Sequence, residues 1–189
     1  MNQVIFNTLD GKKIGLFVDE ANLFYSQKSL GWHIDWQKTL ALLGDRGEVR
    51  VARFYMGMPE TRHKSYDQNV VIKHRLEKSG IQVVTKPLKK IYTRTAPQSF
   101  IYKCNFDVEI TRDIIKELPR LDSIVLASSD SDFIGLRDEV LAQGKGFVFL
   151  CFERNVAWEI RRSRHIFFES IRAEVEYKNK SPGSKSGVK

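Results

Sequence analysis

The sequence predicts a three-layer α/β/α sandwich with a mainly parallel central sheet, and two observations lead to this fold class. Short apolar segments with the composition of strands alternate along the chain with longer segments typical of helices. Two of the apolar segments, 123–127 and 146–151, are continuous runs, as strands buried on both faces require. The alternation of the two kinds of segment favours right-handed crossovers between neighbouring parallel strands.

Six segments are predicted as strands of this sheet. The second of them, VRVARFYM, alternates in the manner of a half-buried strand, and we expect Gly57-Met58-Pro59 to end it. Residues 86–103 contain β-forming side chains but are punctuated by Pro87 and Pro97, so we expect a ragged hairpin there. In chain order the six strands are 14–18, 49–56, 81–85, 123–127, 146–151 and 165–168.

Six helices are predicted between these strands, and capping residues bound most of them. Asp35 is placed to cap the second helix, and Pro119 ends the fourth. Gly31, Gly80 and Gly144 close three others, since glycine readily adopts the left-handed conformation that follows a helix. In chain order the helices are 20–30, 36–43, 61–79, 106–118, 132–143 and 155–163.

The length of 189 residues suits one domain, which we place at residues 1–177, followed by a basic tail at 178–189 with the composition of a disordered segment. Four lysines in that tail supply half of the net charge of +8, so the charge is weak support for a nucleic-acid partner. No signal peptide and no apolar run near the ~18 residues of a membrane span are expected. Cys104 and Cys151 are too few for a disulfide framework or a zinc site, which favours reduced cysteines in a cytoplasmic protein.

Acidic side chains follow two of the predicted strands directly. Asp19 comes after the first strand, and Asp130 and Asp132 come after the strand at 123–127, where functional groups of parallel sheets collect. Asp107 begins the helix that leads into that strand. Converging carboxylates repel one another unless a cation neutralises them, and oxygen donors favour Mg²⁺ or Mn²⁺. The alternative is that Asp130 or Asp132 only caps the helix that follows.

Three stretches resemble motifs of one family: FVDEANL at 17–23, KCNFDVEITRDI at 103–114 and LASSDSDF at 126–133. In this order they are similar to the NYN domain, in the LabA-like branch of the PIN-like nuclease superfamily. The resemblance implies a PIN-like, Rossmann-like fold and a metal-dependent ribonuclease that hydrolyses RNA phosphodiesters. By the same resemblance the metal-binding and catalytic residues are Asp19, Asp107, Asp130 and Asp132. Asn22 and Lys103 match motif positions that position the first acid or the phosphate, and Asp113 matches a further acid of the same helix.

The chain departs from the family motifs at three positions where glycine is common, namely Glu20, Cys104 and Ser129. Glycine allows close approach of the backbone, so these replacements alter the geometry of the cleft, and Glu20 offers an additional acid. Two other functions therefore stay open. One is a catalytically weak or inactive RNA-binding or regulatory module, and the other is a metal-dependent phosphatase.

The expected hairpin at 86–103 combines basic and aromatic residues, a mixture suited to single-stranded nucleic acid. Lys89, Lys90 and Arg94 are therefore further candidates for binding RNA, whether single-stranded or structured. The alternative is an ordinary solvated hairpin whose aromatic side chains pack inward. The oligomeric state stays open, with a homodimer as one option because PIN-like domains often pair.

Overall fold

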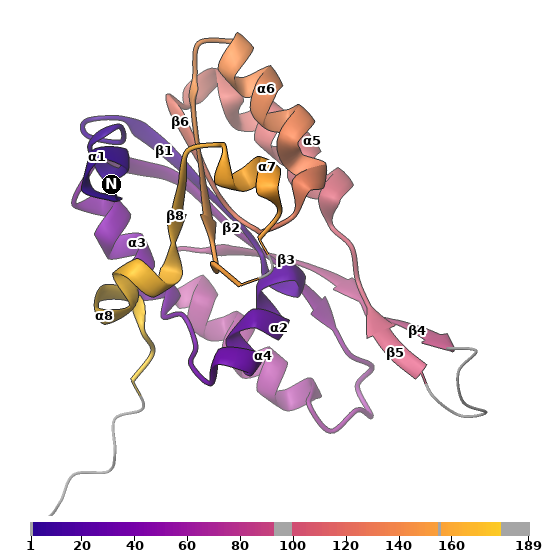
Figure 1. The fold of residues 1–189 in the computed structure, drawn as a ribbon. Helices are drawn as coiled ribbons and strands as arrows, with labels where there is room; N and C mark the ends of the chain where they lie inside the picture. The colour runs from indigo at the N-terminus through magenta and orange to yellow at the C-terminus, as the bar shows by residue number, and fades with distance from the viewer. Residues whose placement is uncertain (1, 93–99, 155, 179–189) are drawn as a thin grey trace, which may run out of the picture.

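The computed structural model describes residues 2–92, 100–154 and 156–178. A six-stranded sheet with the order β3-β2-β1-β6-β7-β8 forms its centre, and every neighbouring pair of strands in it is parallel (Figure 1). The strands are β1 (Lys13–Asp19), β2 (Glu48–Met58), β3 (Gln82–Pro87), β6 (Ser123–Ala127), β7 (Gly146–Cys151) and β8 (His165–Phe167).

Helices cover both faces of the sheet, which confirms the predicted three-layer α/β/α fold (Figure 1). The helices are α1 (Asn2–Asn7), α2 (Glu20–Leu30), α3 (Trp36–Gly44), α4 (Tyr66–Lys78), α5 (Asp107–Glu117), α6 (Ile134–Ala142), α7 (Trp158–Arg161) and α8 (Arg172–Val175). Within the described ranges, no helix is long and apolar enough to cross a bilayer.

The sheet separates two apolar cores because successive side chains of a strand point to opposite faces. In β6, Val125 and Ala127 belong to the core shared with α1, α2, α3, α4 and α8. Ile124 and Leu126 belong to the other core, which α5, α6 and α7 cover. All five residues of β6 are buried, as the continuous apolar run predicted.

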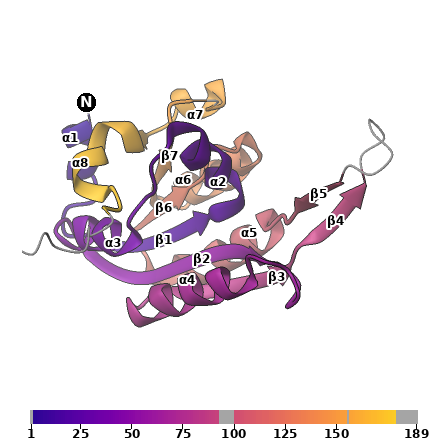
Figure 2. The same cartoon turned by 90° about the horizontal axis from the view of Figure 1, so that it is seen from below.

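Two short strands, β4 (Lys89–Tyr92) and β5 (Phe100–Lys103), pair antiparallel and form a separate two-stranded sheet. The predicted hairpin is therefore present, although its connection at 93–99 lies outside the described residues. Figures 1 and 2 show that this hairpin extends away from the main sheet, beyond β3 and α5. The tail from residue 179 onward, and Arg94, also lie outside the described residues.

Several predicted boundaries were wrong. The helix expected at 61–79 begins only at Tyr66, because residues 61–65 form turns in which His63 Nδ1 lies 2.7 Å from Ser65 Oγ. The helix expected from residue 132 begins at Ile134, after a 3₁₀ turn at Ser131–Phe133. The helix expected at 155–163 is confined to Trp158–Arg161. Helices α1 and α8 and the 3₁₀ helix Phe168–Ile171 were not predicted from the sequence.

Gly57 lies inside β2 and does not end it. It pairs with Lys86 of β3, and a Cβ atom at this position would come within 2.3 Å of Leu88 Cδ2. The Leu88 side chain, which follows β3, takes the space that a Cβ atom would need, so glycine at this position reflects side-chain packing and not a turn.

Candidate metal centre

Asp19 lies at the carboxyl end of β1, next to the end of β6. In the register of these two strands Val18 pairs with Ala127, which places Asp19 beside Ser128. The Ser128 hydroxyl donates a hydrogen bond of 3.1 Å to Asp19 Oδ2, and the backbone N–H of Asn22 donates one of 3.4 Å to Asp19 Oδ1. Asp19 therefore caps α2 and is 5% exposed.

Asp130 and Asp132 lie on the turn that connects β6 to α6. Asp130 Oδ1 accepts a hydrogen bond of 3.0 Å from the backbone N–H of Asp132, so Asp130 caps the 3₁₀ turn Ser131–Phe133. The backbone N–H of Asp130 donates a hydrogen bond of 3.2 Å to Ser128 Oγ. The capping alternative is thus correct for Asp130, but this cap occupies only Oδ1.

Asp107 reaches the same place from the other side, from the first turn of α5. Asn105 fixes its position twice: Asn105 Nδ2 donates a hydrogen bond of 2.6 Å to Asp107 Oδ2, and Asn105 Oδ1 accepts one of 2.8 Å from the Asp107 backbone N–H. Asn105 was not among the predicted site residues, although asparagine often forms such a turn with the backbone N–H two residues further on.

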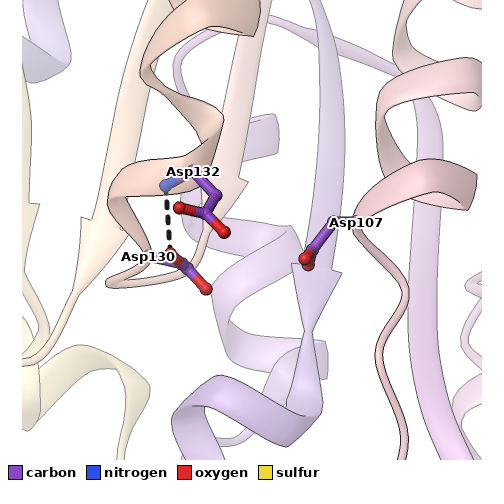
Figure 3. A group of neighbouring side chains, drawn as sticks. All are labelled: Asp107, Asp130 and Asp132. Carbon is purple, nitrogen blue, oxygen red and sulfur yellow. Dashed lines mark hydrogen bonds between the residues drawn. The ribbon is translucent and has the colours of Figure 1, made fainter.

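One carboxylate oxygen from each of Asp107, Asp130 and Asp132 lies within 4.8 Å of the other two. Figure 3 shows the Asp107 side chain directed from α5 toward Asp130 and Asp132, which follow β6. Asp107 and Asp130 are half-buried, and Asp132 is exposed. Within the described part of the chain, no lysine or arginine forms an ion pair with any of the three.

Burial and neighbouring charges shift the pKa of two acids at this site, Asp107 and Asp19. Burial raises the pKa of Asp107, hydrogen bonding from Asn105 lowers it, and the charges of Asp130 and Asp132 raise it further. Burial likewise raises the pKa of Asp19 to about 6 against the hydrogen bonds from Ser128 and Asn22, and the charges of Asp107 and Asp130 add to the rise. Asp19 therefore lies within the field of the cluster, beside the three acids whose oxygens converge.

The three converging acids, with Asp19 beside them, fit a divalent cation. They supply oxygen donors, and no cysteine or histidine joins the described cluster, which suits a hard cation such as Mg²⁺ or Mn²⁺. A cation among them would remove the repulsion that raises the pKa of Asp107.

Asn22 connects the two acid-bearing segments. Its side-chain Oδ1 accepts a hydrogen bond of 2.7 Å from the backbone N–H of Ser129, while its own backbone N–H reaches Asp19. The Asn22 side chain therefore holds the segment that follows β6, and only the backbone N–H of Asn22 contacts Asp19, so a role of the side chain in orienting the first acid stays a prediction. The Ser129 hydroxyl is buried and has no hydrogen-bond partner among the described residues.

The two additional acids have separate surroundings. Glu20 adjoins Asp19, and burial, followed by the Asp19 charge, raises the pKa of Glu20 to about 7. Asp113 lies apart from the cluster of Asp107, Asp130 and Asp132. It is 6% exposed and lies against β2, where Tyr55 and Arg53 contact its carboxylate.

The predicted RNA-binding lysines lie on the hairpin. Lys89 begins β4 and pairs with Lys103, which ends β5, and both side chains are exposed, as is Lys90. Lys103 precedes Asp107 by four residues, which limits their Cα separation to about 14 Å. Arg94 lies outside the described residues, so its role stays a prediction.

A parallel sheet with acids gathered at the ends of β1 and β6 and at the start of α5 defines the PIN-like class of nuclease-like folds. The family model described as "NYN domain" matches residues 13–171, and the chain belongs to this family.

Individual proteins resemble the chain over most of its length. It is 26% identical over 168 residues to the "Low amplitude and bright protein LabA" of Synechococcus elongatus, a match that covers 87% of this chain and 88% of that protein. A crystal structure of a Vibrio parahaemolyticus protein of unknown function superposes with a TM-score of 0.68 at 22% identity. That match covers 88% of this chain and 97% of the other and shows a shared fold.

Proposed function

We propose that the protein is a ribonuclease that requires Mg²⁺ or Mn²⁺ and hydrolyses RNA phosphodiesters. The observation that carries this proposal is the convergence of Asp107, Asp130 and Asp132 from two separate elements onto one point, with oxygens within 4.8 Å of one another. Membership of the NYN family supports it, because PIN-like nucleases usually use divalent ions.

Each acid has a distinct part in this proposal. Asp107, Asp130 and Asp132 would hold the ion directly, and Asp19 adds negative charge beside them. Asp19 also accepts a hydrogen bond from the Ser128 hydroxyl, which in turn accepts one from the backbone N–H of Asp130. When bound, a divalent ion lowers the pKa of a coordinated water and offsets charge that develops on the phosphate. Asn22 keeps the segment that bears Asp130 in place through its hydrogen bond to the backbone N–H of Ser129.

The choice of RNA as substrate rests on the family and on the basic hairpin. Lys89, Lys90 and Lys103 are exposed on β4 and β5, and neither strand contains an acidic residue. Phosphodiester backbones attract such groups with a strength that falls as salt rises. A cytoplasmic location and a homodimer stay predictions.

The experiment is a Mn²⁺ titration of the wild type and of Asp130→Asn, with metal binding and the integrity of a labelled RNA followed together. Asparagine retains the oxygen that caps the 3₁₀ turn but removes the charge, so the fold is expected to persist. Asp138→Asn is the matched control, because Asp138 is an exposed aspartate that pairs with Arg137 on α6.

Binding and cleavage in the wild type and in Asp138→Asn, and neither in Asp130→Asn, is the expected result. RNA binding without cleavage in any metal would contradict the proposal and favour a regulatory module. Release of phosphate from phosphomonoesters without polymer cleavage would contradict it and favour a phosphatase.

A further inference from the structure

The strand register places the aromatic residues of the hairpin on one face. Lys90 pairs with Tyr102 and Tyr92 pairs with Phe100, and directly opposed residues of an antiparallel pair share a face. The intervening pair, Ile91 and Ile101, and the pair Lys89 and Lys103 alternate with them. We call the set Lys90, Tyr92, Phe100 and Tyr102 the aromatic face.

The contacts on this face hold its side chains together without burying them. The Phe100 ring lies edge-on to Tyr92 and to Tyr102, with centroids 6.4 Å and 5.4 Å apart. Lys90 Nζ lies 3.9 Å from the Phe100 centroid and 5.4 Å from that of Tyr92. Tyr92 is nevertheless 72% exposed and Phe100 is 41% exposed. The alternative of an ordinary hairpin with inward-packed aromatics therefore does not describe Tyr92.

The aromatic face continues onto the main domain. The His63 ring stands edge-on to Tyr102 with a centroid separation of 5.3 Å. Arg62, the preceding residue, lines a groove of about 600 Å³ at the carboxyl ends of β2 and β3 together with Lys86. Lys86 Nζ donates a hydrogen bond of 3.2 Å to the carbonyl oxygen of Asn105, whose side chain holds Asp107.

We propose that the aromatic face of the β4–β5 hairpin is a binding platform for single-stranded RNA, on which bases stack while the hairpin lysines contact phosphates. The inference rests on the proposed ribonuclease function, because it takes the platform to deliver the strand to the Asp107, Asp130 and Asp132 cluster. Each base presents an aromatic surface, so stacking of this kind tolerates any sequence. In a duplex the bases are already stacked on one another and are not presented to the platform.

Charge favours RNA over a second copy of the chain as the occupant of this face. Lys90 lies on the aromatic face, Lys89 and Lys103 lie on the other face, and neither strand carries an acid, so two copies that met through the aromatic face would bring Lys90 toward a hairpin with no opposite charge. The anionic backbone of RNA is complementary to the same charges. Lys103, the last residue of β5, lies within about 14 Å of Asp107 by chain length, so the hairpin starts near the acids.

The test measures the affinity of the full chain for a fluorescein-labelled single-stranded RNA by fluorescence anisotropy in EDTA, where no metal-dependent cleavage occurs. Tyr92→Ala and Phe100→Ala are each expected to weaken binding about five-fold or more, the usual effect of removing one stacking ring. Tyr92→Phe keeps the ring and is expected to bind like the wild type. Tyr25→Ala is the matched control, because Tyr25 on α2 is 67% exposed and lies outside the hairpin.

Salt dependence and strand state provide two independent readouts. Lys90→Gln is expected to reduce the slope of log affinity against log salt by about 0.7 for the phosphate contact that it loses. A duplex of the same sequence is expected to bind more weakly than the single strand. Equal affinities of Tyr92→Ala, Phe100→Ala and Tyr25→Ala would overturn the proposal, and so would duplex binding as tight as that of the single strand.

A failure of the RNA-binding platform and a failure of the ribonuclease proposal give different results. If RNA binding depends on the hairpin but no Mn²⁺-dependent cleavage occurs, the ribonuclease proposal is contradicted and the platform proposal stands. If Mn²⁺-dependent cleavage occurs but the hairpin substitutions leave RNA affinity unchanged, the platform proposal is contradicted and the ribonuclease proposal stands. If the wild type is a dimer and Tyr92→Ala is a monomer with unchanged RNA affinity, the face joins two copies and the proposal is overturned.

Discussion

The hydroxyl of Tyr55 on β2 donates a buried hydrogen bond of 2.9 Å to the carboxylate of Asp113 on α5. Arg53 Nη1, two residues earlier on the same face of β2, lies 3.1 Å from the same oxygen, and its Nη2 lies 2.6 Å from Glu117 Oε1. This polar network ties α5 to the sheet. Because Asp107 lies in the first turn of α5, the network also helps to place Asp107 opposite Asp130.

Asp113→Asn is expected to lower the free energy of unfolding at neutral pH by about 2 kcal/mol, the usual value of a hydrogen bond to a charged group. The loss should lower Tm by roughly 4–8 °C in a chain of this size. Arg53 keeps its contact with Glu117, so the loss should stay below that of a fully orphaned buried charge. Thermal denaturation checks this, with the exposed Asp67→Asn on α4 as control.

The same variant tests a pH dependence. Burial raises the pKa of Asp113, but the hydrogen bonds from Arg112 and Tyr55 and the charges of Arg53 and Arg112 outweigh it and hold the pKa below its ordinary value of 3.8. A carboxylate with a depressed pKa contributes stability above its unfolded pKa and loses it as the pH falls through the folded pKa. The difference in unfolding free energy between wild type and Asp113→Asn should therefore shrink below about pH 4. A difference that is constant between pH 7 and pH 3 would contradict this.

Removing a charge from the acid cluster should not destabilise the metal-free protein. Asp132→Asn relieves repulsion between Asp132 and Asp107, which is a cause of the raised pKa of Asp107. We expect Tm in EDTA to be equal to or higher than that of the wild type. Saturating Mn²⁺ should raise Tm of the wild type, because it binds only the folded chain, and should leave Asp132→Asn nearly unchanged. A large drop in Tm in EDTA would mean that Asp132 has mainly a structural role.

The adjacent residues Ser128 and Ser129 form a matched pair. The Ser128 hydroxyl donates to Asp19 and accepts from the Asp130 backbone N–H, so Ser128→Ala removes one buried and one half-buried hydrogen bond and should cost about 1–3 kcal/mol. The Ser129 hydroxyl has no partner among the described residues, so Ser129→Ala should leave the unfolding free energy unchanged or raise it. Urea denaturation of both variants distinguishes them, and equal losses would contradict the assignment.

Asn22→Ala is expected to lower kcat for RNA cleavage while it lowers the free energy of unfolding only slightly. The substitution leaves the backbone N–H of Ser129 without its 2.7 Å partner, at an expected cost of about 1 kcal/mol. The segment that carries Asp130 and Asp132 would then be less firmly placed relative to Asp19, so kcat should fall while Tm changes by a few degrees. Unchanged kcat at saturating Mn²⁺ would show that Asn22 does not position these acids.

The sequence alone determined the sheet and the location of the candidate site. Hydrophobic pattern and chain order sufficed to predict the strands, their parallel arrangement and the positions of Asp19 at the end of β1 and of Asp130 and Asp132 after β6. The hairpin was also foreseeable from the β-forming residues on either side of Pro97. The helix boundaries at residues 66 and 134 were not foreseeable, because side-chain turns that involve Ser65 and Asp130 compete with the helical pattern.

Only the tertiary structure decided what each acid contacts. Asp107 and Asp113 lie on the same helix, and nothing local to α5 distinguishes the candidate metal ligand from the partner of Arg53 and Tyr55. The packing of Ile110 and Ile114 against the sheet sets the rotation of α5, which turns Asp113 toward Arg53 and Tyr55 and leaves Asp107 at the sheet edge. Such contacts join residues far apart in sequence, and their geometry arises only when the two faces of the sheet are packed.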